Sequence, residues 1–261
     1  MRPVGTARAQ TAWQRLAFAA VGPLAVVLAL TFLLWGATAG PIPSRSPFAG
    51  YSWQGSVRSV RGSWTVPRII GGSAPEVAAT WIGAQAPGSS GPFIQIGTNE
   101  QRVNSSLLPF ASTPSTYYAF WSDTAHDFRP VNLFPVNPGD DLAASMTLGR
   151  KGWTVAIADQ STGENARVTT AQEAHGSFNQ AEWTQEDATD RLTGEPFPYP
   201  PLSTVSFSRL AVNSTTPGLG DMASTAMSEN GNELTPGPLH DDSFTLHQVT
   251  LRLAGRHGHA A

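Results

Sequence analysis

The chain has 261 residues, of which 40% are hydrophobic and 13% charged, so it can fill a hydrophobic core and does not have the composition of a disordered protein. It contains no cysteine, which excludes disulfide bonds, thiolate nucleophiles and thiolate metal sites. Its formal net charge of −3 argues against nucleic acid as a partner.

The N-terminal segment has the features of an export signal. Residues 1–15 carry arginines and no acidic residue, and residues 16–35 form a nearly unbroken apolar run. Ala37-Thr38-Ala39 is a small-residue site at which a signal peptidase could cut. The apolar run could instead anchor the protein in a membrane, since a span needs about 20 residues. We therefore expect residues 1–39 to be a signal peptide or membrane anchor, with the rest extracellular or at the cell surface.

The rest of the chain divides by composition. Residues 40–50 are rich in proline and serine, which predicts a linker. Residues 51–254 carry the strand patterns and are expected to form one domain. Residues 255–261 are predicted to be a flexible tail. The two histidines in this tail lack a third ligand and do not predict a metal site.

After residue 50 the chain has an all-β pattern. Apolar or aromatic residues alternate with polar ones in short runs, and turn-forming glycines, prolines and asparagines separate these runs. No stretch has a sustained helical period, so the sequence predicts a sandwich of antiparallel sheets. Residues 214–242 are weakly patterned, and no structure is predicted there. The expected strands are 63–66, 79–85, 93–97, 117–121, 142–148, 153–158, 181–185, 205–210 and 243–253.

Familiar hydrolase motifs are missing. There is no Gly-x-Ser-x-Gly elbow, His-Glu-x-x-His zinc helix or Asp-Thr-Gly loop. The candidates are instead polar or aromatic residues within strands. If Ile94 and Ile96 face the core, Gln95 lies on the open face of a sheet. Similarly, Ile82 would face inward and Trp81 outward, where a ring can form the floor of a cleft. Taken alone, each segment fits an ordinary solvated or loop-covered strand better than a site.

A third segment, Ala181 to Asp187, carries several polar side chains. In an extended strand Glu182, Thr184 and Glu186 share one face, while Trp183 points to the other. A carboxylate cluster on a sheet face is usually solvated. It indicates chemistry only if other polar groups converge on it.

Taken together, these segments resemble the eqolisins, the G1 family of glutamic peptidases. Each motif is weak alone, whereas their order and spacing are much more specific. The matching motifs are Gly62-Ser63-Trp64-Thr65-Val66-Pro67, Thr80-Trp81-Ile82-Gly83, Ile94-Gln95-Ile96-Gly97, Tyr117-Tyr118-Ala119-Phe120-Trp121, Asn137-Pro138-Gly139-Asp140, Ser161-Thr162-Gly163-Glu164 and Ala181-Glu182-Trp183-x-x-Glu186.

The resemblance covers about residues 51–253 and implies a lectin-like (concanavalin-type) sandwich of two antiparallel sheets, with the site on one concave face. It implies that Gln95 and Glu186 are the catalytic pair, that Trp81 lies in the cleft, and that polypeptides are the substrate. The other residues expected to contact substrate are Phe93, Tyr118, Phe120, Ser122, Glu182 and Thr184.

The chain departs from the family pattern at three places. Ala84-Gln85 and Ser122 stand where the family often has an acidic residue, and Gln185 stands where an apolar residue is usual. These departures leave the catalytic pair intact and bear on substrate preference and catalytic strength.

The two candidate catalytic residues suit peptide hydrolysis. A glutamate can take a proton from water and return it to the leaving amine. A glutamine amide donates hydrogen bonds without titrating, so it can stabilise an oxyanion. An ordinary glutamate, with a pKa of about 4.3, stays ionised in mild acid. An acidic optimum is therefore expected for Glu186, as the resemblance also implies, and no metal or organic cofactor is required.

Two other functions stay open. Glucanases on the same sandwich use a Glu-x-Asp-x-Glu strand, and Glu182-x-Thr184-x-Glu186 has that spacing without the aspartate. This alternative leaves Gln95 without a role. The chain could also be a non-catalytic or glycan-binding module that keeps the fold. Such a module has no need to keep both Gln95 and Glu186, which favours the enzyme.

Overall fold

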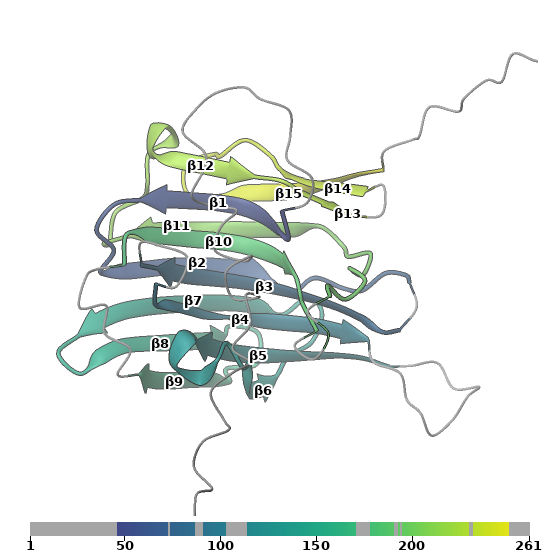
Figure 1. Cartoon of the computed structure of the whole chain (residues 1–261), viewed down its shortest axis with the longest axis horizontal. Coiled ribbons are helices and arrows are strands. Elements are labelled where there is room, and N and C mark those ends of the chain that lie inside the picture. The colour runs from purple at the N-terminus through teal and green to yellow at the C-terminus, as the bar shows by residue number, and fades with distance from the viewer. Residues whose placement is uncertain are drawn as a thin grey trace, which may run out of the picture.

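The computed structural model describes residues 46–72, 74–86, 91–102, 114–170, 178–190, 193, 195–229 and 232–250. Within them the chain forms two antiparallel sheets, which Figure 1 shows as two layers of strands. The expected all-β sandwich is confirmed. The segments 1–39 and 255–261 lie outside the described residues. In the described part, no helix is long and apolar enough to cross a membrane.

The two sheets have seven and eight strands, and all pairings between neighbouring strands are antiparallel. Sheet A has the order β12 (Met222–Thr225), β1 (Phe48–Gln54), β10 (Gln180–Asp187), β3 (Glu76–Gln85), β4 (Phe93–Arg102), β5 (Ser115–Asp123) and β6 (Val131–Pro135). Sheet B has the order β13 (Met227–Glu229), β14 (Asn232–Pro236), β15 (Phe244–Thr250), β11 (Val205–Val212), β2 (Ser59–Thr65), β7 (Asp141–Gly149), β8 (Gly152–Asp159) and β9 (Asn165–Thr170). The short 3-10 helices are η1 (Thr124–His126) and η2 (Leu219–Asp221).

Every strand expected from alternation is present, although residues 251–253 of the last one lie outside the described residues. The sequence did not predict β1, β6 and β9, nor the strands β12, β13 and β14 within residues 214–242. Of these, β6, β9 and β13 lie at sheet edges, and β12 forms the remaining edge of sheet A. Edge strands are commonly short and partly solvated, so they lack the clear alternation that a half-buried strand needs.

The predicted linker boundary at residue 50 is wrong. Strand β1 begins at Phe48, directly after Pro47, and pairs with β10 from its first residue. Pro47 has no N–H to donate, but its carbonyl accepts a hydrogen bond from the Asp187 backbone N–H at 2.8 Å. A proline-rich approach is therefore compatible with a strand that starts at once, and residues 48–50 belong to the domain.

Alternation along the central strands separates two faces of sheet A. Ile82, Ile94, Ile96 and Trp183 are fully buried in the main core between the sheets, as their alternation predicted. Trp183 also donates its indole N–H to the backbone carbonyl of Arg61 on β2, at 2.7 Å. This cross-sheet bond satisfies the polar end of a buried ring. The residues between these positions point to the opposite face of sheet A, away from the main core. This face is called the open face below because sheet B does not cover it.

The carboxyl group of Glu100 lies in the core. Glu100 is fully buried and accepts a hydrogen bond from Thr98 Oγ1 at 2.6 Å, and Thr98 in turn accepts one from Trp64 Nε1 at 3.1 Å. Thr80 Oγ1 lies 3.2 Å from both Glu100 oxygens and 2.6 Å from Gln185 Oε1. Since Thr80 has one hydroxyl proton, a protonated Glu100 supplies the second donor. Burial raises the pKa of Glu100 to about 8, and the hydrogen bonds from neighbouring side chains such as Thr98 and Thr80 partly oppose this rise.

Replacing this carboxyl group by an amide, Glu100→Gln, is expected to make folding stability less sensitive to pH. The folded pKa is raised from 4.5 to about 8, so the stability contribution is complete below about pH 4 and is lost as the pH rises toward 8. The loss is about 1.4 kcal/mol per pH unit within that window. Urea unfolding at pH 4 and pH 8 should show a smaller difference for the variant than for wild type.

The matched control is Glu164→Gln, since Glu164 is an exposed glutamate in the turn between β8 and β9. This control should lose as much stability between pH 4 and pH 8 as wild type does. An equal loss in the Glu100→Gln variant would show that the buried carboxyl group does not govern the pH dependence.

Candidate active site

Strand β3 is the central strand of sheet A. Its residues Ala79, Trp81 and Gly83 lie on the open face. The neighbouring strands supply the candidate catalytic residues. Gln95 on β4 pairs with Gly83, and Glu186 on β10 pairs with Ala79. Because side chains alternate along each strand and paired residues share a face, Gln95 and Glu186 both project onto the face of Trp81.

The other predicted site residues lie on the same face. Thr184 pairs with Trp81, and Ser122 pairs with Gln95. Alternation along β4, β5 and β10 places the other predicted site residues of these strands on the same face as Trp81 and Gln95. All nine predicted site residues therefore share the open face of sheet A, namely Trp81, Phe93, Gln95, Tyr118, Phe120, Ser122, Glu182, Thr184 and Glu186.

Glu186 is held by Trp81. The Trp81 indole N–H donates to Glu186 Oε2 at 2.8 Å. Burial raises the pKa of Glu186 to about 7, and the hydrogen bond from Trp81 opposes this rise. The pKa of Glu186 therefore lies above that of the ordinary glutamate on which the expectation of an acidic optimum relied.

A second carboxyl group, Glu182, lies on the same strand. It is buried, and Gln180 donates its side-chain N–H to Glu182 Oε1 while receiving a hydrogen bond from Gln54. The pKa of Glu182 is raised to about 7, mainly by burial; the hydrogen bond from Gln180 opposes this rise, and the charge of Glu186 contributes to it. Since repulsion between two negative charges is mutual, ionisation of either carboxyl group disfavours ionisation of the other.

Gln95 is fixed by the neighbouring strand. Its Nε2 donates to Ser122 Oγ at 2.8 Å, and its side chain is 9% exposed. Its Oε1 is buried without a hydrogen-bond partner among the described residues. A buried, unpaired amide oxygen is costly, and such groups occur at functional sites. The bond to Ser122 leaves one N–H and the carbonyl oxygen of this amide available for a bound substrate or water.

Two glycines allow the Trp81 ring to lie across the face. A Cβ on Gly83 would be 2.6 Å from Trp81 Cζ3, and a Cβ on Gly97 would be 2.4 Å from Trp81 Cβ. The first contact would force the indole to move, and the second would also force the backbone of β3 to shift, since that Cβ would lie 2.2 Å from the Thr80 carbonyl oxygen. The ring therefore extends from Glu186, which its N–H contacts, to Gly83, the register partner of Gln95.

Sequence reasoning missed two parts of the site. Phe48 on β1 pairs with Glu186 and packs edge-on against Trp81, with ring centroids 6.0 Å apart at 85°. It was missed because it was assigned to the linker. Gln180, which holds Glu182, lies two residues before it on the same strand, so alternation alone could have placed it on this face.

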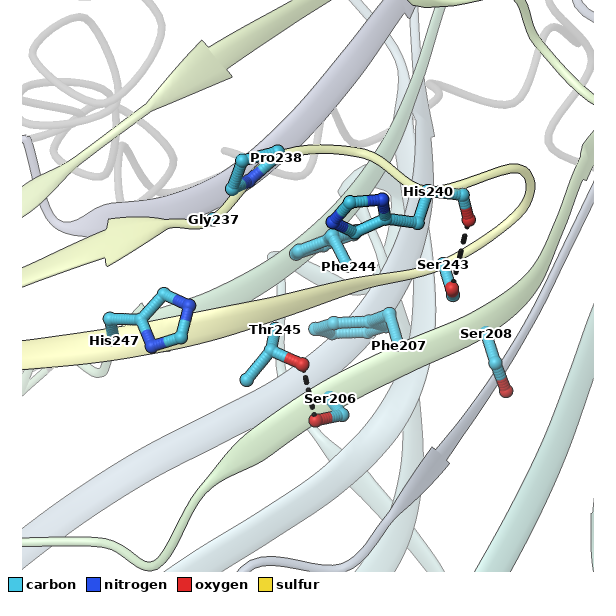
Figure 2. Close-up of a pocket in the computed structure, with 10 residues that line it drawn as sticks. All are labelled: Ser206, Phe207, Ser208, Gly237, Pro238, His240, Ser243, Phe244, Thr245 and His247. Atoms are coloured by element: carbon cyan, nitrogen blue, oxygen red, sulfur yellow. Dashed lines mark hydrogen bonds between the residues drawn. The ribbon is translucent and has the colours of Figure 1, made fainter.

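A separate hollow lies on sheet B and its adjoining loop. It has a volume of about 390 Å³ and is lined by hydroxyl groups and by two histidines, His240 and His247. Figure 2 shows the two imidazoles set apart, with Ser206 bonded to Thr245 across the strands at 2.9 Å. None of the nine predicted site residues lines this hollow. Among the described residues, no group of three or more His, Cys, Asp or Glu side chains is placed to hold a metal ion.

The chain matches known peptidases in sequence and in structure. Residues 46–248 match the sequence model of the Peptidase A4 family. Scytalido-glutamic peptidase, crystallised with a transition-state analogue inhibitor, is 19% identical with a TM-score of 0.63, covering 80% of this chain and 100% of that one. SCP-B, an eqolisin bound to the tripeptide Ala-Ile-His, is 18% identical with a TM-score of 0.59 and the same coverage. Aspergilloglutamic peptidase from Aspergillus niger is 16% identical with a TM-score of 0.53, covering 67% and 99%.

No curated protein sequence matches the chain. The similar structures, at 19% identity or less, show the fold. The family match spans most of the chain and confirms the resemblance found in the sequence motifs. The chain therefore belongs to the Peptidase A4 family, the eqolisin-type glutamic peptidases, and is a peptide-bond hydrolase.

Proposed function

We propose that the chain is an endopeptidase in which Glu186 and Gln95 form the catalytic pair. The observation that carries this proposal is their placement on one face of sheet A, on strands that flank Trp81. Each is held by a hydrogen bond, Glu186 by the Trp81 indole and Gln95 by Ser122. A peptide bound over this part of the face would meet both side chains.

The proposed reaction is a direct attack by water. Ionised Glu186 takes a proton from a water molecule, and the resulting hydroxide bonds to the carbonyl carbon of the scissile peptide. The Gln95 amide N–H stabilises the oxyanion that forms, while its carbonyl oxygen accepts the second water hydrogen. When the tetrahedral intermediate collapses, the C–N bond breaks and Glu186 returns its proton to the leaving amine. Both residues then regain their starting state.

Ser122 supports this mechanism in a way an acidic residue would not. Its hydroxyl group does not titrate in the working range, so the bond that holds Gln95 is independent of pH. The carboxylate that the family often has at this place would change charge with pH. The departure at Ser122 is therefore compatible with an active Gln95.

The proposal is tested by incubating the full-length protein with an unfolded polypeptide and, separately, with a β-glucan, from pH 4 to pH 8. New amino termini should appear in the polypeptide, and no reducing ends should be released from the glucan. Thr184, in place of an aspartate between Glu182 and Glu186, disfavours the glucanase chemistry. Glucan cleavage, or no cleavage of either substrate by folded protein, would overturn the proposal.

The pH dependence should reflect the raised pKa of Glu186. Its ionised form is the base, so kcat/KM of wild type should rise with pH through an apparent pKa near 7. Glu182→Gln removes the neighbouring negative charge, which makes ionisation of Glu186 easier and moves this rise to lower pH. A profile of kcat/KM against pH for both proteins measures the shift.

The control for this pH profile is Glu164→Gln, which removes a carboxylate from the exposed turn between β8 and β9 and should leave the profile unchanged. An acidic optimum with the rise below pH 5 in wild type would contradict the raised pKa of Glu186. A rise that Glu182→Gln does not move would contradict the coupling between the two carboxyl groups.

We further propose that the peptidase acts outside the cytoplasm. The arginine-rich start followed by the apolar run 16–35 supports export, either with cleavage after Ala39 or with retention as a membrane anchor. The N-terminal residue of the exported protein, measured by mass spectrometry, distinguishes cleavage from retention. Protein found only in the cytoplasm would contradict export.

A further inference from the structure

An apolar cluster lies on the open face of sheet A, separate from the main core. Phe48, Trp81 and Phe120 are its buried aromatic members, and Phe93 packs against them while partly exposed. The cluster shares its face with Glu186 and contacts it through the Trp81 indole. A substrate bound at the proposed catalytic pair would therefore lie beside apolar rings.

These rings continue as a row to the surface. Trp81 and Phe93 pack edge to face, with centroids 5.5 Å apart at 81°. Phe93 then packs against Phe128, with centroids 6.0 Å apart at 38°. Trp81 is 1% exposed, whereas Phe128 is 43% exposed. The row thus begins at Glu186 and ends in a ring with a large open surface.

The turn after β5 holds Phe128 in an unusual backbone conformation. Asp127 and Phe128 have φ values of 54° and 56°, in the left-handed region that a bulky residue rarely adopts. The Phe128 N–H donates to the Asp123 carbonyl at 2.9 Å. The buried Asp123 carboxylate accepts from the His126 N–H at 2.9 Å and from Thr170 Oγ1 at 2.7 Å. The turn is therefore fixed at both ends and presents the Phe128 ring.

The same turn is joined to the catalytic face. Thr124 Oγ1 accepts from the Phe93 N–H at 2.8 Å, which ties the turn to the start of β4. Ser122, two residues earlier, holds Gln95. Phe93 and Gln95 are alternate residues of β4 and share a face. Hydrogen bonds and ring contacts therefore connect Phe93 and Phe128 to the side-chain amide of Gln95.

We propose that Phe93 and Phe128 form a subsite that binds one large apolar side chain of the substrate, aromatic or long aliphatic. This inference rests on the proposed function. Such a side chain would bury apolar surface against both rings, and an aromatic one could pack edge to face. A charged side chain would lose hydration there without gaining a partner. Cleavage sites with a large apolar residue at one position should be favoured about 10- to 100-fold over sites with alanine.

The test compares wild type, Phe128→Asn and Phe128→Tyr in the full-length protein, with a pool of peptides whose cleavage sites are identified by mass spectrometry. Asparagine tolerates the left-handed conformation, so the turn should fold without the ring. We expect kcat/KM to fall at least about 10-fold for sites with phenylalanine or leucine, mainly through KM, and to stay unchanged for sites with alanine. Phe128→Tyr should retain the preference.

The matched control is Ile70→Ala, because Ile70 is an exposed apolar residue, 63% accessible, outside the row of rings. The Ile70→Ala variant should keep the wild-type preference for large apolar residues at the cleavage site. An apolar preference that Phe128→Asn leaves unchanged, or a wild-type enzyme that cleaves without any apolar preference, would overturn the subsite alone. No peptide cleavage by folded wild type would overturn the proposed function, and the subsite with it.

Discussion

Replacing Glu186 by glutamine is expected to lower kcat for peptide hydrolysis by about 10²- to 10⁴-fold, the usual contribution of a general base or acid. The variant keeps the size of the side chain and an oxygen that can accept the Trp81 N–H bond, which is 2.8 Å long in wild type. Only proton transfer is lost, so KM should change little. Steady-state kinetics on one peptide at pH 7 measures both constants.

Folding controls separate this loss from damage to the structure. Because the folded pKa of Glu186 is raised from 4.5 to about 7, the wild-type carboxyl group contributes full stability only below about pH 4 and loses it as the pH rises through 7. The Glu186→Gln variant should therefore be at least as stable as wild type at pH 7. The surface variant Glu164→Gln should keep full activity. A Glu186→Gln variant with more than a tenth of wild-type kcat would not be compatible with Glu186 as the base.

Replacing Gln95 by alanine is expected to lower kcat by about 10²- to 10³-fold, equivalent to about 2.7–4 kcal/mol of transition-state stabilisation. The Gln95 amide would donate to the oxygen of the substrate only when that oxygen becomes charged. Its loss should therefore appear in kcat more than in KM. The reaction should remain detectable because Glu186 still activates water. Kinetics at pH 7 on the same peptide provides the measurement.

The control for this change is Gln160→Ala, which removes an exposed glutamine just after β8. It should have wild-type kinetics. If Gln95→Ala raises KM and leaves kcat unchanged, Gln95 binds substrate and does not stabilise the oxyanion. The structure would then keep its peptidase assignment but lose the proposed glutamate–glutamine pair.

The strands that sequence reasoning found are those with one face in the main core. In β4, for example, Ile94 and Ile96 are buried and Gln95 lies between them, so alternation is unambiguous. The first three residues of β1, 48–50, fall within the predicted linker because prolines precede them closely. Phe48 also packs on the open face, away from the core that gives the other strands their pattern.

The face of sheet A that each candidate residue occupies could be predicted, but not the surroundings of its side chain. A period of two decides which face each side chain takes, and this placed Gln95, Trp81 and Glu186 correctly. It says nothing about what covers that face. Phe48 is the strand partner of Glu186 and packs against Trp81, which donates to Glu186, and burial raises the pKa of Glu186 to about 7. The bond between Trp81 and Glu186 joins residues 105 positions apart, so the period of a single strand cannot predict it.

Two departures from the family pattern have a physical account in the structure. Gln185 is fully buried on the core face, where its Oε1 accepts a hydrogen bond from Thr80. A polar side chain is therefore tolerated at a position where an apolar one is usual. Ser122 holds Gln95 on the open face. For the third departure, Gln85, nothing in the structure explains the change.

The central claim is that this chain hydrolyses peptide bonds with water activated by Glu186 and an oxyanion held by Gln95. The most direct measurement incubates an unfolded polypeptide with the full-length protein in ¹⁸O-labelled water at pH 7 and analyses the fragments by mass spectrometry. Wild type should yield fragments with one ¹⁸O in each new carboxyl terminus, and the double variant Gln95→Ala/Glu186→Gln should yield none above background. Intact polypeptide after incubation with folded wild type, or equal cleavage by the double variant, would contradict the account.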